Sequence, residues 1–154
     1  MSKIKLTETV ATAVNLLGAL RFLKTNSSRV SAAFGYTLSR NIAALEPIEK
    51  AFLDALQESQ SELITSAEPE RLAIVSRYTD ETTGQLDDAA ANLAWQEYLG
   101  ANPDLIAALS ARAEHIKELE TTKETFEVRM LPLAAFPNDL DPGIWDVLHL
   151  VVQD

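Results

Sequence analysis

Apolar residues recur at helical spacing over most of the chain, and the clearest case is residues 31–66. In this segment the apolar positions follow one another at alternating steps of four and three. Side chains at that spacing lie on one face of a helix. They are Leu38, Ile42, Leu45, Phe52, Leu56 and Leu63. We therefore predict one long helix over residues 31–66, on which the other segments pack.

Pro47 interrupts this long helix. Proline removes a backbone donor and crowds the preceding turn, at a cost of about 3 kcal/mol in a helix interior. The segment therefore either kinks near residues 43–46 or consists of two helices that meet there. The apolar spacing continues unbroken across Pro47, which favours the kink.

Capping residues and prolines indicate five shorter helices. Their expected positions are residues 7–24, residues 68–78, residues 88–100, residues 103–122 and a last helix that begins at Asp141-Pro142. Thr7 is the expected cap of the first helix, and Ser28 or Ser31 that of the long one. Glu68-Pro69-Glu70 is expected as a first helical turn, because proline is tolerated there.

Two segments alternate polar and apolar residues, which is typical of strands. They are residues 3–6 and residues 125–131. A two-stranded ribbon is marginal alone, so we expect helices to hold it. The predicted fold is mainly α: a single domain over residues 1–154, in which an antiparallel helical bundle surrounds the long helix and carries a minor two-stranded β element.

The most distinctive run is Tyr36-Thr37-Leu38-Ser39-Arg40-Asn41-Ile42, followed by Leu45-Glu46. With the KIKL start, the charged loop at residues 78–84, the Glu127-Val128 strand and the Asp141-Pro142 helix, it resembles a family of small uncharacterised proteins of tailed bacteriophages and prophages. The resemblance spans most of the chain, although residues 88–94 and Pro47 depart from it. It implies phage origin and supplies no catalytic residues.

Charge narrows the choice of partner. The 154 residues include 13 Lys and Arg against 23 Asp and Glu, a formal net charge of −10. Direct binding of nucleic acid or of an anionic membrane surface is therefore not expected. An acidic surface suits a basic protein partner, or keeps the protein in solution. The chain has no cysteine, and we identify neither a signal peptide nor a membrane span.

No catalytic, metal or cofactor motif emerges. His115 and Glu118 share a helix face, but a metal site needs three or four ligands. His149 lies among apolar residues, where packing is the simpler interpretation. The acidic loop at residues 80–88 fails the EF-hand spacing, and the chain has no phosphate loop. We therefore expect no enzyme activity and no cofactor.

Three residues are candidates for partner binding: Arg40, Trp95 and Trp145. Arg40 either anchors a partner or pairs with an acid inside the fold, and the second role is favoured. Aromatic residues often anchor interfaces. Trp145 lies off the inward stripe of its helix, so exposure is plausible, although packing at the core or at a domain edge is favoured for both tryptophans.

Two functions follow as hypotheses. The first is a non-enzymatic virion structural or assembly protein that contacts itself or another phage or host protein, with a homo-oligomer as one expectation. The alternative is an acidic inhibitor that imitates DNA and blocks a basic host or defence protein. Either function would place the protein in the host cytoplasm or the virion.

Overall fold

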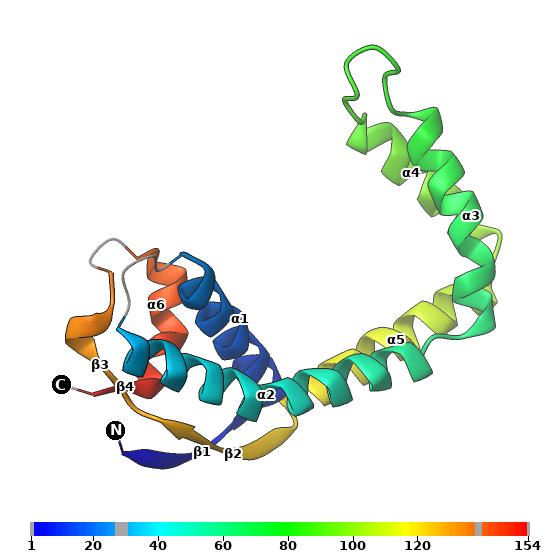
Figure 1. Cartoon of the computed structure of the whole chain (residues 1–154). Coiled ribbons are helices and arrows are strands. Elements are labelled where there is room, and N and C mark those ends of the chain that lie inside the picture. Colours follow the sequence, from blue (N-terminus) through cyan, green and yellow to red (C-terminus); the bar gives the residue numbers. More distant parts are fainter. Residues whose placement is uncertain (1, 27–30, 138–139, 154) are drawn as a thin grey trace. The chain divides into compact units, whose positions relative to one another are not determined.

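A computed structural model describes residues 2–26, 31–137 and 140–153 and is 72% helical (Figure 1). Its helices and strands are β1 (Lys3–Thr9), α1 (Val10–Asn26), α2 (Ala32–Glu58), α3 (Glu62–Arg77), α4 (Asp88–Gly100), α5 (Pro103–Thr121), β2 (Lys123–Arg129), β3 (Leu131–Pro132), η1 (Leu133–Ala135), α6 (Pro142–Leu148), η2 (His149–Val151) and β4 (Val152–Gln153). The predicted mainly α class and its helical-bundle character are confirmed.

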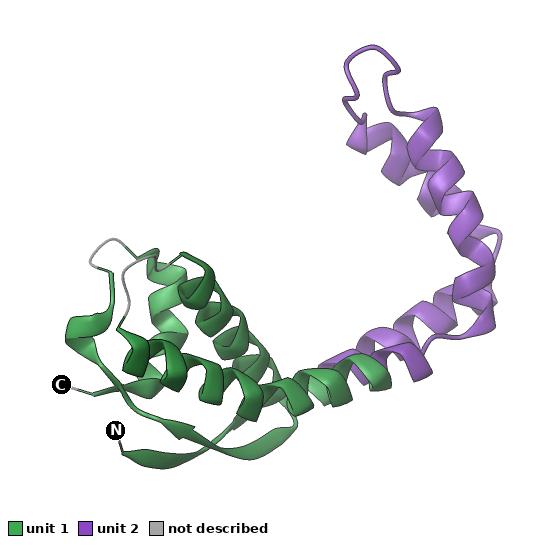
Figure 2. Ribbon diagram, in the orientation of Figure 1, with its two compact units in different colours: residues 1–55, 118–154 green, residues 56–117 purple. Residues whose placement is uncertain are grey.

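The chain divides into two compact units (Figure 2). Unit 1 contains residues 1–55 and 118–154, and unit 2 contains residues 56–117. The boundary falls inside α2 and again inside α5. That residues 1–154 act as one domain stays a prediction.

In unit 1, β1 and β2 form the expected antiparallel ribbon, with Lys3 opposite Arg129 and Thr9 opposite Lys123. One face of the ribbon packs on the core through the buried side chains of Phe126 and Val128. The other face is solvated and carries Lys5 and Glu127. β1 extends to Thr9 rather than ending at residue 6, and Thr7 and Thr125 join their hydroxyls across the ribbon at 2.9 Å. The second predicted strand is divided, because Leu131 and Pro132 leave β2 and pair in parallel with β4.

The core of unit 1 combines α1, α2, the ribbon and the C-terminal helices. Its buried side chains are Ala13, Leu16, Leu17, Ala19, Leu20, Leu23, Phe34, Leu38, Ile42, Leu45, Phe126, Val128, Leu131, Phe136, Leu148 and Val151. In the last helix, Leu148 is fully buried and Ile144 packs at the edge of this core. Phe22 on α1, by contrast, is 43% exposed.

Unit 2 consists of α3, α4, the loop between them, most of α5 and the last turn of α2. Within it, α3 packs against α4. Among its described residues only Ala67, Ile74, Ala91 and Leu105 are buried hydrophobic residues. Asp87 caps α4, where its carboxylate accepts a hydrogen bond from the amide of Ala90 at 3.1 Å.

The long helix is shorter than predicted. α2 ends at Glu58, and α3 begins at Glu62 after Ser61, whose hydroxyl accepts a hydrogen bond from the amide of Ile64 at 3.3 Å. The apolar spacing passes through this break, so it does not mark where one helix ends and the next begins. Pro69 is also wrongly placed in the prediction, since it lies inside α3 rather than in a first turn.

The helix continues through Pro47, as the unbroken apolar spacing favours, and the alternative of two helices that meet there is wrong. The cap of α1 is Thr9 rather than Thr7, because the strand runs further than expected and Thr9 Oγ1 accepts from the amide of Thr12 at 3.2 Å. Ser31 does lie at the start of α2, where its hydroxyl accepts from the amide of Phe34 at 3.2 Å. Ser28 lies outside the described residues.

Candidate functional site

The distinctive Ser39-Arg40-Asn41 run divides into three different environments. Ser39 donates its hydroxyl to the carbonyl of Gly35 within α2 at 3.0 Å. Asn41 is buried and faces the core, whereas Arg40 is exposed. Arg40 forms no ion pair with any described residue, so the favoured internal pairing of its guanidinium is not observed.

Asn41 connects α2 to the ribbon through two hydrogen bonds. Its Nδ2 donates to the carbonyl of Arg129 at 2.8 Å, and its Oδ1 accepts from the amide of Arg129 at 2.8 Å. The side-chain amide thus takes the place of a neighbouring strand. A buried backbone group without a partner costs about 1–3 kcal/mol, so this residue satisfies two groups that would otherwise be costly. The hydrogen-bonding role of Asn41 is therefore structural.

Each tryptophan packs against another aromatic side chain. Trp95 on α4 is half-buried and stacks on Tyr98, with ring centroids 5.3 Å apart. Trp145 on α6 is half-buried and meets Phe136 edge to face at 5.4 Å, at the border of the unit 1 core. The packing at a core or domain edge that the sequence favours is therefore the environment of Trp145. Arg40 and Trp145 lie in unit 1, and Trp95 lies in unit 2.

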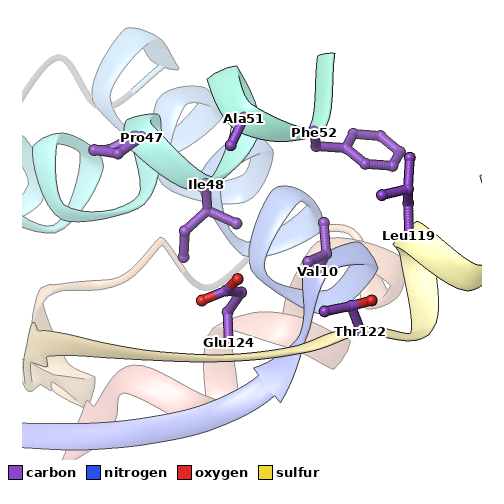
Figure 3. A pocket seen from close by; sticks show the side chains of 8 residues that line it. All are labelled: Val10, Pro47, Ile48, Ala51, Phe52, Leu119, Thr122 and Glu124. Atoms are coloured by element: carbon purple, nitrogen blue, oxygen red, sulfur yellow. The ribbon is translucent and has the colours of Figure 1, made fainter. Parts of the chain in front are cut away.

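A pocket in unit 1 is the main feature that sequence reasoning missed (Figure 3). Its volume is about 340 Å³, and its walls come from α1, α2, the end of α5 and β2. The lining residues are Val10, Pro47, Ile48, Ala51, Phe52, Leu119, Thr122 and Glu124. Figure 3 shows Ile48 and Glu124 extending from opposite walls toward the same space. No local motif marks the pocket, because its walls come from segments far apart in the sequence.

The lining of this pocket limits its chemistry. Apart from the hydroxyl of Thr122 and the carboxylate of Glu124, the lining side chains are apolar. Glu124 lies opposite Glu8 in the ribbon, and neither forms an ion pair with a described residue. The pocket can hold an apolar group, and its carboxylate favours a positive charge beside it.

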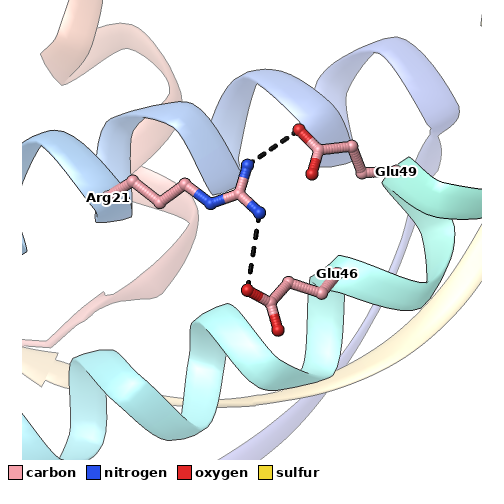
Figure 4. A network of polar contacts seen from close by, with 3 residues as sticks. All are labelled: Arg21, Glu46 and Glu49. Atoms are coloured by element: carbon pink, nitrogen blue, oxygen red, sulfur yellow. Dashed lines mark hydrogen bonds and ion pairs between the residues drawn. The ribbon is translucent and has the colours of Figure 1, made fainter. Parts of the chain in front are cut away.

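Arg21 of α1 joins this helix to α2 (Figure 4). Its guanidinium donates to Glu49 at 2.8 Å and lies 3.4 Å from Glu46. The hydrogen bond to Glu49 is the main cause that raises the pKa of Arg21. Its side chain is partly exposed, and the network therefore helps to orient two helices rather than to perform chemistry.

In the acidic loop after α3, the carboxylate of Asp80 accepts hydrogen bonds from backbone amides of the same loop. Asp80 Oδ1 accepts from the amides of Thr83 at 2.7 Å and Thr82 at 2.8 Å, and these bonds lower the pKa of Asp80. Thr79 pairs with Leu86 across the loop, and Gly84 takes the left-handed conformation with φ of 69°. Among the described residues, no group of three His, Cys, Asp or Glu side chains could hold a metal ion.

Charge is unequally divided between the units. Unit 2 has eleven acidic and four basic residues, a formal charge of −7 in 62 residues. Unit 1 has twelve acidic and nine basic residues, a formal charge of −3. One basic residue of unit 2 is also unusual, because the Nε of Arg112 is buried and has no hydrogen-bond partner among the described residues.

Comparison with models of protein families, with curated proteins and with solved structures finds no match to this chain. Within the described ranges, no helix has both the length and the apolar character needed to cross a membrane.

Proposed function

We propose that the protein is a non-enzymatic phage protein that assembles with other copies or another protein, and that unit 2 provides the contacts. The resemblance to phage and prophage proteins supports the phage origin. A role in the virion or in its assembly fits a chain whose polar networks hold the fold together. Hydrogen bonds within the fold are formed by the side chains of Asn41, Arg21 and Asp80.

The observation that carries the proposal is the small buried core of unit 2. Its 62 residues include only four buried hydrophobic side chains among those described, and two of these are alanines. Several larger apolar side chains of this unit are about half exposed or more: Leu63, Leu72, Leu93 and Ile106. A unit with so little buried apolar surface gains little folding free energy from its own packing. A partner that covers these side chains would bury more apolar surface and stabilise the unit.

The solution mass of the purified protein, measured by light scattering at low and high salt, tests this role. Apolar contacts persist in salt, so an oligomer at both concentrations is the expected result for self-assembly. The decisive variant replaces the four exposed apolar residues of unit 2 with serine. It should lose the oligomer while its helical circular dichroism is retained.

A matched control is Leu53→Ser, which changes an equally exposed leucine of unit 1 and should leave the mass unchanged. If the variant of unit 2 assembles as the wild type does, unit 2 is not the contact surface. The phage role has its own test, because mass spectrometry of purified particles should find the chain in virions. A gene deletion that leaves particle yield and shape intact would contradict it.

The second candidate is an inhibitor that imitates DNA, and the charge of −7 on unit 2 favours it. Such a protein would remain a monomer at all salt concentrations and bind a basic protein. DNA would compete for that site, and the affinity would fall steeply with salt. Binding that is indifferent to salt and to DNA would contradict this alternative.

A further inference from the structure

The pocket in unit 1 has one wall on the ribbon, and that wall carries a carboxylate with a second one opposite it. Residues two apart in a strand lie on the same face, so Glu124 shares the core-facing side of β2 with the buried Phe126. Glu8 lies directly opposite Glu124 in the ribbon, on the same side as Leu6. The row of side chains that faces the core is therefore apolar at Leu6 and Phe126 and then carries two carboxylates.

This pair of carboxylates is unfavourable for the fold alone. Like charges at opposite positions destabilise an antiparallel pair, because their Cβ atoms are only about 5 Å apart. Among the described residues, neither Glu8 nor Glu124 takes part in an ion pair. Lys50 of α2 pairs with Asp54, and Lys123 belongs to the solvated face of β2. A positive charge brought by a ligand would relieve the repulsion.

The rest of the pocket has room for an apolar body. Its volume is about 340 Å³, within the range of roughly 300–1,000 Å³ that is typical of small-molecule sites. An apolar cavity of about 150 Å³ holds benzene, so this space fits a body of roughly one to two rings or an alkyl chain of equal size. Ile48, Phe52 and Leu119 supply apolar walls, and Figure 3 shows Ile48 facing Glu124 across the space.

We propose that this pocket binds a small organic cation, namely an amine or ammonium group attached to an apolar body of that size. The apolar body packs against α2 and the end of α5, and the cationic group lies beside Glu124 and its neighbour Glu8. The hydroxyl of Thr122 donates to the carbonyl of Glu118 at 2.9 Å, so its oxygen is able to accept a hydrogen bond from the ligand. Charge excludes an anion of the same shape.

This site goes beyond the function proposed for unit 2, because all its lining residues belong to unit 1. The two proposals also fail separately. The serine variant of unit 2 is judged by its solution mass, whereas the experiments below measure the affinity of a small molecule for the pocket.

The first test compares probes that share one apolar body and differ in the charge of the head group: phenylbutylamine, phenylbutanol and phenylbutyrate. Titration of the full-length chain near neutral pH, followed by NMR, measures the dissociation constant of each probe. The amine should bind roughly tenfold more tightly than the alcohol, because a hydrogen bond between charged groups is about twice as strong as a neutral one. Phenylbutyrate should not bind. The shift changes should be concentrated at the methyl groups of Ile48 and the amides of Thr122 and Glu124.

The second test removes the carboxylate. Glu124→Gln keeps the shape of the side chain, and its affinity for phenylbutylamine should fall roughly tenfold, to that of the alcohol. Glu127→Gln is the matched control, since it removes the same charge from the solvated face of the same strand and should bind the amine as the wild type does. Glu124→Gln should melt no lower than the wild type, because it relieves the repulsion with Glu8.

The third test fills the apolar part of the pocket. Ala51→Leu adds a larger side chain from α2 without loss of helix propensity, and it should weaken the binding of both the amine and the alcohol. No binding of the amine, equal binding of all probes, or full binding to Ala51→Leu would overturn the proposal. So would an equal loss of amine binding in Glu124→Gln and Glu127→Gln, which would indicate general attraction to an acidic chain. A lower melting temperature of Glu124→Gln would also overturn it, because the carboxylate would then stabilise the fold itself.

Discussion

Unit 1 and unit 2 are both built from amphipathic helices, yet they bury them to different extents. In unit 1, α1 packs against α6 and the ribbon, and its leucines at 16, 17, 20 and 23 have no exposed surface. In unit 2, α3 packs against α4, and Leu72 on α3 is 55% exposed. The difference teaches that an apolar residue in a helix is buried only where enough neighbours surround it.

The same contrast appears along α2 itself. Leu38 and Leu45 are buried near its start, while Leu53 near its end is 54% exposed. Leu38 and Leu45 lie on the apolar track of the sequence, and Leu53 lies directly beside it. Burial therefore depends on the segments that converge on the first half of α2, which come from both ends of the chain.

The largest expected effect separates the two units directly. Leu20→Ala removes a side chain with no exposed surface, and such truncations cost about 2–5 kcal/mol of unfolding free energy. Leu72→Ala changes a largely exposed side chain and should cost within about 0.5 kcal/mol. Urea denaturation of both variants measures the two values. Equal losses would mean that the units do not differ in the way their burial indicates.

The next largest loss of stability is expected at Asn41, whose side chain bonds the backbone of Arg129 in unit 1. Asn41→Ala leaves both backbone groups of Arg129 without their partner, for an expected loss of about 2–4 kcal/mol. Ser39→Ala is the matched control two residues away, because its hydroxyl bonds only within α2. Hydrogen exchange should also accelerate at the amide of Arg129 in the Asn41 variant alone. An unchanged exchange rate there would contradict the role given to this side chain.

Pro47 provides a smaller effect of opposite sign. Pro47→Ala restores a donor to the interior of α2, and the expected gain is about 1–2 kcal/mol after the greater freedom of the unfolded chain is deducted. Ala51→Pro is the matched control one turn later and should cost about 3 kcal/mol. Thermal unfolding of the two variants measures both. A loss of stability in Pro47→Ala would show that α2 depends on the proline.

The sequence was sufficient for the features that depend on near neighbours. The alternation around Phe126 and Val128 predicts β2, and the order Asp141-Pro142 predicts the start of α6. The break at residues 59–61 was missed because the apolar spacing continues across it, although Ser61 is a good cap. The buried position of Asn41 was within reach, since it lies between Leu38 and Leu45 on the apolar face of α2.

Features assembled from distant segments were not predictable in this way. The pocket needs α1, α2, α5 and β2 together, and no local pattern states that Val10 lies near Leu119. The division of burial between the units has the same origin. Leu63 and Leu45 have equivalent positions in the apolar spacing, but Leu63 is 50% exposed and Leu45 is buried.

The smallest expected effect is a titration, and it tests whether unit 2 has local order that does not depend on a core. The amides of Thr83 and Thr82 hold the ionised carboxylate of Asp80, which lowers the pKa of Asp80 below its ordinary value of about 3.9. A lowered pKa means that the bonds contribute stability above the ordinary value, and that this contribution is lost as the pH falls through the lowered one. Carbon-13 NMR of the Asp80 carboxyl should show the low midpoint, and the amide shifts of Thr82 and Thr83 should follow the same curve. Asp80→Ala removes the shared transition and is the control. An ordinary pKa for Asp80 would mean that the loop does not hold this conformation in solution. Unit 2 would then have neither a large buried core nor an ordered loop.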